Sequence, residues 1–268
     1  MQLRNTAVRS PDALADGRPL TARSVLASTL LGVSEPGPAA LPVAYLVHMA
    51  GLFGINENRA RVALSRMVAS GEATTDGAGG YSLAGHLLDR QRRQRASRAG
   101  HTRPWGGAWH VVVVTTAGST AEVRGRRRRA LAVARLGELR EGTWMRPDNL
   151  DLVLDDALAG DVTVLAGARL DDPAALAARL WDLRRWAREA EGLVGRLEAR
   201  PPAGVRDLTP GFVLSASVLR HLQADPLVPE PLLPADWPGV RLRRVYDGWD
   251  ARYRAVLARW SREFAPIG

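Results

Sequence analysis

One stretch of this sequence combines the chemistry of base recognition with the spacing of a helix. Residues 56–70 fit a helix at about 100° of rotation per residue, with Ala60, Leu64, Met67 and Val68 gathered on one side. The opposite side carries polar and methyl-bearing groups: Asn58, Arg59, Val62, Ser65 and Arg66, with Arg61 on the flank. In the DNA major groove, guanidinium groups pair with guanine, carboxamides with adenine, and methyl groups meet thymine. The face is therefore suited to DNA, although an ordinary solvated helix has a similar composition.

Two further helices are predicted before this stretch. Thr21 can cap a helix whose apolar positions share one face and which ends at Gly32. A Pro-Gly-Pro loop at 36–38 separates it from a second helix over 42–52. Asn56 can then cap the third helix, and Glu57 is well placed in its first turn.

A short hairpin is predicted after the third helix. Residues 73–75 and 81–83 are β-prone, and the segment between them, 76–80, has the composition of a tight turn. Three helices followed by a hairpin is the element order of a winged helix-turn-helix, in which one helix enters the major groove. This context favours DNA recognition over a merely solvated helix face.

The predicted wing is unusual because it carries no basic side chain. No arginine occurs between residues 66 and 90, so contacts to phosphates would fall to Thr74, Thr75, Ser82 and backbone amides. Asp76 would repel phosphates. The polar helix predicted over 85–100 holds five arginines: Arg90, Arg92, Arg93, Arg95 and Arg98. These could supply the missing contacts, or could form an ordinary solvated, salt-bridged face.

The charge of the chain also favours a nucleic-acid partner. The 268 residues carry a formal net charge of +9, and all 37 basic residues are arginine. Residues 1–104 hold 13 arginines against 7 acidic residues, whereas residues 105–268 hold 24 against 21. A basic N-terminal part joined to a more neutral remainder is typical of a DNA-binding domain attached to a second module. A generally basic proteome would give a similar average, so the charge supports this interpretation without deciding it.

Composition and motifs exclude several other classes of protein. The chain has no cysteine, which excludes disulfides, thiolate metal sites and a cysteine nucleophile. The five histidines show no metal-ligand spacing, and neither a nucleophile elbow nor a phosphate-binding loop occurs. We therefore predict no catalytic residue, no metal, no cofactor and no enzymatic activity.

No segment of the sequence has the character of a targeting or membrane element. Charges are scattered through residues 1–17, unlike a signal peptide. The longest apolar segment, 41–55, is interrupted by His48 and by glycines and is too short to span a bilayer. We expect a soluble cytoplasmic protein that does not bind membranes.

The second part of the chain mixes strands and helices. A β-branched run at 109–115 predicts a buried strand, and a basic helix is expected over 121–136. Residues 142–145 and 162–165 are further strand candidates. Asp172 and Pro173 open one long helix whose apolar stripe runs to Pro201. The remainder is predicted to be helical, interrupted by a proline-rich passage at 225–238.

Three separated blocks of the sequence resemble the PaaX family, the regulators of phenylacetic acid degradation. Residues 54–71 resemble the family's recognition segment. The matching positions are Arg61, Ser65, Arg66 and Gly71, whereas Asn56 stands where the family usually has serine. Residues 105–109 resemble the start of the family's middle domain. Residues 140–147 resemble a strand of that domain through Gly142, Trp144 and Pro147. Residues 225–229 and 232–239 resemble the family's C-terminal string. The blocks occur in the family's order and extend over about residues 21 to 260.

The resemblance implies a repressor that binds a palindromic DNA operator as a homodimer. It also implies release by an acyl-CoA effector, typically phenylacetyl-CoA, and a ferredoxin-like middle domain similar to a CRISPR-associated nuclease fold. We predict an α+β protein with an N-terminal winged helix-turn-helix, a middle ferredoxin-like α/β domain and a mainly helical C-terminal domain. The expected parts are a flexible tail (1–20), the DNA-binding domain (21–84), a basic connector helix (85–104), the middle domain (105–172) and a helical effector and dimerisation domain (173–268).

Two other functions stay open on the sequence alone. A metal-dependent nuclease built on the middle domain would need several carboxylates, and Asp155, Asp156 and Asp161 could form such a cluster or serve as loop and cap residues. The predicted strand at 109–115 ends without the carboxylate that a nuclease would need there.

The other alternative is a ligand-sensing or dimerising module without an operator of its own. Aromatic residues gather in the second half of the chain, where most should belong to the core and some could line a pocket. The candidates for binding an acyl-CoA effector are Arg184, Arg185, Trp237, Arg241 and Arg243, with Arg244 as a further basic candidate.

Overall fold

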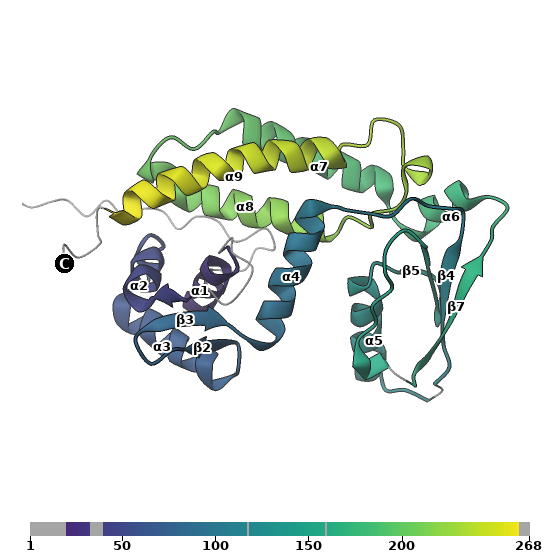
Figure 1. Ribbon diagram of the computed structural model, residues 1–268, viewed down its shortest axis with the longest axis horizontal. Coiled ribbons are helices and arrows are strands. Elements are labelled where there is room, and N and C mark those ends of the chain that lie inside the picture. Colours follow the sequence, from purple (N-terminus) through teal and green to yellow (C-terminus); the bar gives the residue numbers. More distant parts are fainter. Residues whose placement is uncertain (1–19, 33–39, 117, 159, 263–268) are drawn as a thin grey trace, which may run out of the picture. The chain divides into compact units, whose positions relative to one another are not determined.

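The structure of the protein, a computed structural model, describes residues 20–32, 40–116, 118–158 and 160–262 (Figure 1). The chain forms two compact units, each assembled from distant parts of the sequence. The first contains the described residues of Met1–Ala99, Leu193–Gln223 and Arg241–Gly268, and the second those of Gly100–Gly192 and Ala224–Val240. The predicted loop at 36–38, and the predicted tail except Leu20, lie outside the described residues.

The N-terminal part of the first unit contains the three predicted helices, α1 (Ala22–Leu31), α2 (Val43–Gly51) and α3 (Glu57–Ala69). Both predicted side-chain caps are confirmed. The Thr21 hydroxyl accepts a hydrogen bond from the Ser24 backbone N–H at 3.1 Å, and the Asn56 carboxamide oxygen accepts one from the Arg59 N–H at 2.9 Å. These caps satisfy amides that the helix itself leaves unpaired, so α1 and α3 begin where the sequence predicts.

The apolar side of α3 lies at the centre of the core of this part. Ala60 and Leu64 are fully buried, and Met67 is only 1% exposed. They pack among buried side chains from the other two helices and the hairpin: Leu26, Leu30, Leu46, Ala50, Ala73 and Leu83. Removing this much apolar surface from water fixes the rotation of α3 about its axis.

A small antiparallel sheet follows α3. Gly71, at φ 71°, turns the chain out of α3, a left-handed conformation that suits glycine. The predicted hairpin is β2 (Ala73–Thr75) and β3 (Gly80–Leu83), and β1 (Leu41–Pro42) adds to it in the order β1-β3-β2. The sequence analysis did not predict β1, because two residues containing a proline form a strand only when a partner strand lies beside them.

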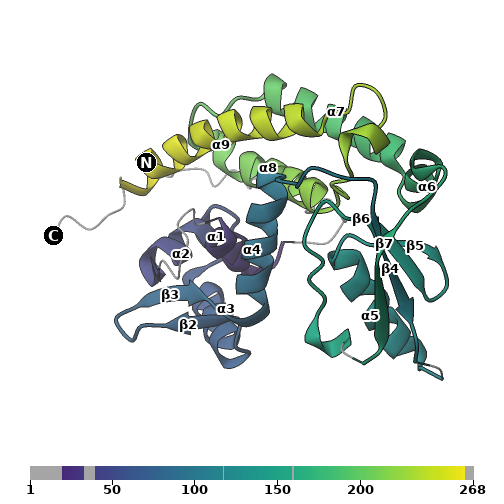
Figure 2. The ribbon, with the colours of Figure 1, turned by 45° about the vertical axis from the view of Figure 1, so that its right-hand side comes forward.

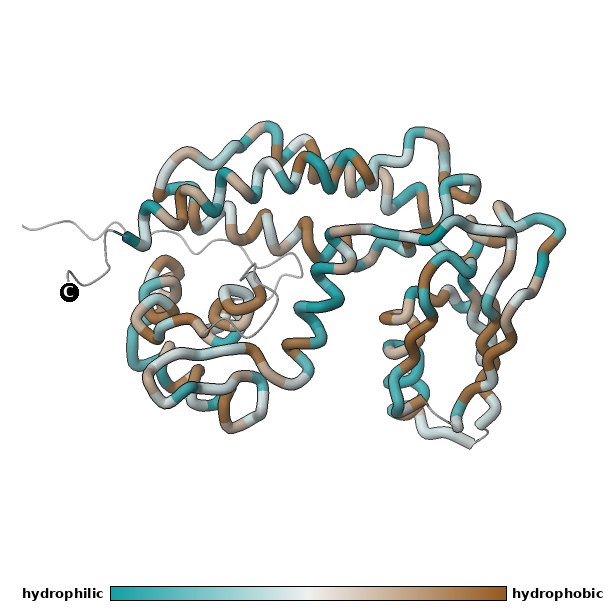
Figure 3. Tube along the Cα trace, viewed as in Figure 1, coloured by the Kyte–Doolittle hydropathy of each residue, from teal (hydrophilic) through white to brown (hydrophobic). Residues whose placement is uncertain are grey.

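Helices far apart in the sequence complete the first unit. Helix α4 (Gly85–Ala99) packs against α1 and α8 (Leu208–Gln223), and α8 is preceded by the short η2 (Val205–Asp207). Helix α9 (Gly239–Arg262) lies beside α8 (Figure 2), where the Tyr253 hydroxyl donates to the Leu208 carbonyl at 2.9 Å. Hydrophilic residues run along much of α4, in teal in Figure 3. Within the described ranges, no helix is both long and apolar enough to cross a membrane.

A four-stranded antiparallel sheet forms the centre of the second unit. Its strands are β4 (Trp109–Val114), β5 (Gly137–Arg140), β6 (Thr143–Pro147) and β7 (Val162–Ala168), in the order β5-β6-β4-β7. Helix α5 (Ala121–Val133) covers one face, where Leu131 packs with Val112 and Trp144. Helix α6 (Pro173–Leu180) and the short η3 (Glu230–Leu232) pack with the other face. The short η1 (Asp156–Leu158) precedes β7.

One strand of this sheet was missed in the sequence analysis. The predicted helix over 121–136 ends at Val133, and the chain then forms β5 (Gly137–Arg140). Glu138 faces Trp144 in the register of β5 with β6. Because β5 holds two charged residues and a glycine among four, its extended form depends on pairing with β6 rather than on its own pattern.

The single long helix predicted from Pro173 to Pro201 is wrong. The chain forms α6 and then α7 (Leu183–Ala199), with Trp181 in an extended conformation between them. The Asp182 carboxylate accepts a hydrogen bond from the Arg185 N–H at 2.9 Å and so caps α7. Trp181 packs against the core of the second unit. The apolar stripe continues across the break, so periodicity alone could not reveal it.

A buried arginine ties the proline-rich segment 224–240 to the middle sheet. Arg146 is 2% exposed and donates to the Ala134 and Pro147 carbonyls at 3.1 and 3.2 Å, and to the Asn149 side chain at 3.3 Å. Asn149 in turn donates to the Leu227 carbonyl at 2.7 Å. Burial of Arg146 lowers its pKa to about 10. Backbone and amide oxygens therefore hold this cation in place.

We expect Leu64→Ala to lower the free energy of unfolding by about 2–5 kcal/mol, because the lost side chain leaves a cavity in a fully buried site. The measurement is denaturant unfolding followed by far-UV circular dichroism. Val62→Ala is the matched control on the same helix, since Val62 is 42% exposed and should change stability by under about 0.5 kcal/mol. Equal effects of the two substitutions would contradict the assigned faces of α3.

Candidate nucleic-acid interface

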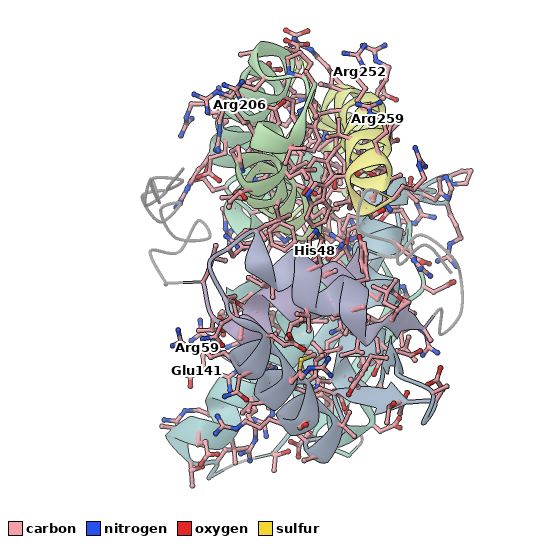
Figure 4. The ribbon with its side chains drawn as sticks, turned by 90° about the vertical axis from the view of Figure 1, so that its left-hand side faces the viewer. His48, Arg59, Glu141, Arg206, Arg252 and Arg259 are labelled. Carbon is pink, nitrogen blue, oxygen red and sulfur yellow. The ribbon has the colours of Figure 1, made fainter. Side chains whose placement is uncertain are left out.

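Helix α3 presents the predicted polar residues to solvent. All six predicted contacts on this helix are exposed: Asn58, Arg59, Arg61, Val62, Ser65 and Arg66. Arg59 projects outward from the helices in Figure 4. The sequence-derived division of α3 into a buried and an exposed side is therefore confirmed.

The arginines of this face differ in whether an acidic side chain pairs with them. Arg61 donates to the Glu57 carboxylate at 2.7 Å, one helical turn earlier, so its charge is partly neutralised. Among the described residues, no protein group binds the guanidinium of Arg59 or Arg66. These two side chains can therefore offer their full set of donors to an external acceptor.

A concavity of about 680 Å³ lies along this face, between α3 and the N-terminal end of α1. It is lined by Asn58, Arg59, Val62 and Arg66 of α3, and by Leu20, Thr21, Ala22 and Arg23 at the start of α1. The sequence analysis did not include the α1 residues in the interface. No sequence signal could have found them, because their position beside α3 depends on the packing of the two helices.

The lining of the concavity includes an ion pair between Arg23 and Glu72. The guanidinium of Arg23 binds both carboxylate oxygens of Glu72, with one contact, from Nε to Oε2, at 2.8 Å. His86 Nε2 lies 3.6 Å from the same carboxylate. The hydrogen bond from Arg23 holds the pKa of Glu72 below its ordinary value, against the opposing effect of burial. The pair joins α1 to the segment that links α3 with β2.

The two threonines of the hairpin are accessible, whereas its serine is buried. Thr74 and Thr75 are exposed, as a phosphate contact would require. Ser82 is 8% exposed, so the prediction that it could contact phosphates is wrong. Thr74 and Ser82 are paired across the two strands and so point to the same side of the sheet, where Ser82 on the central strand β3 is buried and Thr74 on the edge strand β2 is accessible.

Asp76 has a structural part in the hairpin turn. Its carboxylate accepts hydrogen bonds from the backbone N–H groups of Ala78 and Gly80, both at 2.8 Å. The hydrogen bonds from Gly80 and Ala78 lower the pKa of Asp76, so the tip of the hairpin stays negative. A DNA phosphate would be repelled at this point.

The arginines of α4 divide into two groups. Arg98 binds Asp247 and Asp250 of α9, both at 2.7 Å, and lies 4.8 Å from the centre of the Tyr246 ring. Arg92 pairs with Asp89 at 3.1 Å on its own helix. Among the described residues, no protein group binds the guanidinium of Arg90 or Arg93. Only part of the predicted basic connector is therefore available to a phosphate.

Three matches to known family descriptions follow one another along the chain. Residues 21–87 match "PaaX-like protein", residues 102–166 match "PaaX protein central Cas2-like domain", and residues 181–264 match "PaaX-like protein C-terminal domain". Together they cover more than half of the sequence in the order predicted from the three resembling blocks. The chain belongs to the PaaX family. Its α+β fold class, with a ferredoxin-like, Cas2-like central domain and a helical C-terminal part, is confirmed.

A solved structure agrees with the PaaX-family assignment. The chain is 43% identical to an uncharacterized protein, Rv0674, from Mycobacterium tuberculosis, with a TM-score of 0.68. The match covers 88% of this chain and 99% of that one. A comparison with curated proteins found no significant match.

The predicted effector residues of this PaaX-family chain fall in two different compact units. Arg184, Arg185 and Trp237 belong to the second unit, where Trp237 stacks on Trp186 at 4.4 Å and Arg185 pairs with Glu189. Arg241 and Arg243 belong to the first. Arg241 pairs with Glu198 at 3.2 Å, and Arg243 donates to the Ser97 carbonyl at 3.0 Å. None of the five lines the concavity beside α3.

Asp161, one of the acidic residues considered for a metal, has other contacts. Asp161 binds the buried Arg127 at 2.8 Å and accepts a hydrogen bond from the Thr116 hydroxyl at 2.7 Å. The hydrogen bond from Arg127 is the main reason that the pKa of Asp161 is lowered. Across the part of the chain that the structure describes, no three histidine, aspartate or glutamate side chains are grouped as metal ligands.

Glu72→Gln should lower the free energy of unfolding by about 1 kcal/mol near neutral pH, because it removes one partner of a partly exposed, bidentate pair. The folded-state pKa of Glu72 lies below the ordinary value of 4.5. The pair therefore stabilises the fold fully above that value and loses its effect as pH falls through the folded-state pKa. The stability difference between wild type and variant, measured by denaturant unfolding, should shrink in acid. A difference that stayed constant with pH would contradict this role.

Proposed function

We propose that this PaaX-family protein is a transcriptional repressor that binds double-stranded DNA through α3. The observation that carries the proposal is the division of α3, whose apolar side is buried while Asn58, Val62 and Arg66 are exposed together. A helix held in this way can enter a major groove without losing its packing. Membership in the PaaX family supports the role of a regulator.

Each exposed group of α3 has a base that it suits. Arg59 and Arg66 can donate two hydrogen bonds to guanine, and Asn58 can pair with adenine in the same bidentate way. Val62 can meet a thymine methyl group, whereas Ser65 can bond to more than one base. Arg61, which is paired with Glu57, and the hydroxyls of Thr74 and Thr75 are suited to phosphate contacts.

The proposed regulator acts in the cytoplasm as a homodimer on a palindromic operator. Two copies related by a twofold axis would place two α3 helices on symmetric half-sites. In this proposal residues 21–84 bind DNA, 85–104 connect, 105–172 form the middle domain, and 173–268 serve dimerisation and effector binding. The effector is an acyl-CoA such as phenylacetyl-CoA, with Arg184, Arg185, Trp237, Arg241 and Arg243 as candidate contacts and no cofactor.

Arg66→Ala tests the role of α3. Its affinity for an operator in the DNA upstream of the chain's own gene should fall about tenfold to a hundredfold, because a bidentate base contact is worth about 1–3 kcal/mol. The measurement is fluorescence anisotropy with labelled operator and with random DNA of equal length. Arg252→Ala, on the exposed side of α9 (Figure 4), is the matched arginine control and should bind like wild type.

The specificity of the loss decides the outcome. Removal of a base contact should weaken operator binding more than binding to random DNA, and should relax the preference at one position of the site. Equal losses on both DNAs would contradict base recognition by Arg66. Equal losses in the Arg252 variant would show that net charge alone governs the binding.

Phenylacetyl-CoA should lower the affinity of the full chain for its operator. An effector that binds the free protein better than the DNA complex must weaken DNA binding by the same coupling free energy. Anisotropy titrations with the thioester, with free phenylacetate and with free CoA distinguish the intact effector from its parts. If no acyl-CoA thioester changes the affinity, the effector part of the proposal fails, while operator binding stands on its own test.

A further inference from the structure

The basic helix α5 of the second unit carries charges that the proposed function leaves unused. Five of its 13 residues are arginine, and only Glu122 is acidic. Arg127 is 7% exposed and binds Asp161 at 2.8 Å, so this arginine helps to hold the helix on the fold. The other four arginines are exposed, and we call them the arginine face of α5: Arg124, Arg126, Arg128 and Arg129.

The packing of α5 turns the arginine face away from the sheet. Leu131 is fully buried and packs with Val112 and Trp144. At about 100° of rotation per residue, the side opposite Leu131 and Arg127 is centred on small residues. These are Ala121, Gly125 and Ala132, with Arg124 and Arg128 along one flank and Arg126 and Arg129 along the other.

The side chain of Arg129 lies across the small residues at the centre of the face. Its Nη1 atom is 3.5 Å from the position that a Cβ on Gly125 would occupy, one turn earlier. Among the described residues, no protein group binds this guanidinium. Arg124 donates to the Ser119 carbonyl at 2.6 Å, a contact that leaves its positive charge without an opposing carboxylate. Two of the four charges are therefore not neutralised.

The other two arginines of the face have partners that a stronger anion could replace. Arg126 binds Glu122 at 2.6 Å on the same helix, and Arg128 binds Glu138 of β5 at 2.6 Å. The arginine side chains of these pairs are 59% and 67% exposed. Exposed single ion pairs contribute little to stability, because water screens them. The face therefore keeps a positive surface around these two carboxylates.

The arrangement of charges on α5 is unfavourable for the helix itself. Arg124 and Arg128 are like charges one turn apart, which weaken a helix. Arg124 and Arg126 also lie within its first two turns, where the helix dipole favours anions over cations. Gly125 occupies the interior of the helix, where only proline is less favourable. None of these features stabilises α5, whereas each suits a surface that a polyanion approaches closely.

We propose that the arginine face of α5 binds the phosphate backbone of double-stranded DNA, as a contact separate from α3. From Arg124 to Arg129 the helix rises about 7.5 Å. Along that length a DNA duplex carries about four phosphate charges, as many as the face has arginines. Guanidinium groups bind phosphate oxygens in paired, charge-assisted hydrogen bonds. Such contacts position a protein on DNA without reading its sequence.

The choice of DNA as the polyanion rests on the proposed function, whereas the contact does not depend on base recognition by α3. Helix α5 belongs to the second compact unit and α3 to the first. The hairpin of the first unit carries no arginine and has the ionised Asp76 at its tip. A basic surface on the second unit would supply backbone contacts that this hairpin cannot make.

The first experiment measures binding of the full chain to a random-sequence duplex by fluorescence anisotropy at several salt concentrations. The variant is Arg124→Gln/Arg129→Gln, since glutamine is nearly as good a helix former as arginine, and circular dichroism checks the fold. Its affinity should fall about tenfold, and the slope of log affinity against log salt should decrease by about 1.8, or 0.9 for each lost contact. The control is Arg179→Gln/Arg188→Gln, which removes two exposed arginines of the same unit and should leave the slope unchanged.

Glu122→Gln provides a change in the opposite direction. It removes the acidic residue of α5 and releases Arg126 from its ion pair. Binding to the random duplex should become stronger, and the salt slope should steepen by about 0.9, because one more arginine can reach a phosphate. A purely structural role of the pair would predict no gain in DNA affinity. Unchanged or weaker binding by this variant would count against the inference.

Three outcomes overturn the inference. The arginine face is not a DNA contact if Arg124→Gln/Arg129→Gln keeps the wild-type slope, or if the control loses as much as this variant, because net charge alone would then explain the loss. A variant that keeps its DNA affinity but loses binding to vesicles of phosphatidylserine and phosphatidylcholine would identify a membrane contact instead.

Failure of the proposed base recognition gives a different result. The double variant of α5 should weaken operator and random DNA alike, so that the ratio of the two affinities stays that of wild type. If Arg66→Ala loses no operator specificity while the α5 variant still loses affinity and slope, base recognition by α3 fails and the backbone contact of α5 stands.

Discussion

The burial of Ala60, Leu64 and Met67 is the constraint on which the rest of the N-terminal part depends. These three side chains are at most 1% exposed, and they fix α3 against α1 and α2. Because a helix is rigid over so few turns, burying one side determines which groups the other side presents. The polar face needs no contacts of its own to be positioned. It is therefore free to form contacts with a partner.

Local signals made much of the fold predictable. Thr21 and Asn56 cap helices through hydrogen bonds to amides three residues away, and the glycine-rich turn at 76–80 joins two adjacent strands. Such interactions depend only on residues that are close together in the sequence, so they can be predicted from it. The strands β1 and β5 and the break at Trp181 were missed because they depend on partners elsewhere in the chain. A periodic apolar stripe runs through such a break without any change in composition.

The candidate site, like the fold, was predictable only where it depends on local sequence. The exposed face of α3 follows from helical spacing alone, and all six of its predicted residues are on the surface. Arg23 could not be assigned to the site, because its partner Glu72 is 49 residues away. Ser82 was assigned wrongly, because its short strand does not show that it lies between two others, whereas Thr74 opposite it is on an edge strand. Long-range packing decides each of these positions.

Helix α4 shows why a count of basic residues is a poor guide to function. Arg98 and Arg90 are identical side chains two turns apart, yet Arg98 is bound to two aspartates of α9, whereas no side chain among the described residues pairs with the exposed Arg90. The first joins two helices of the fold, and its charge is neutralised there. The charge of Arg90 is not neutralised within the fold and stays available to a partner. Whether an arginine stabilises the fold or recognises a partner is thus set by what the neighbouring helices place opposite it.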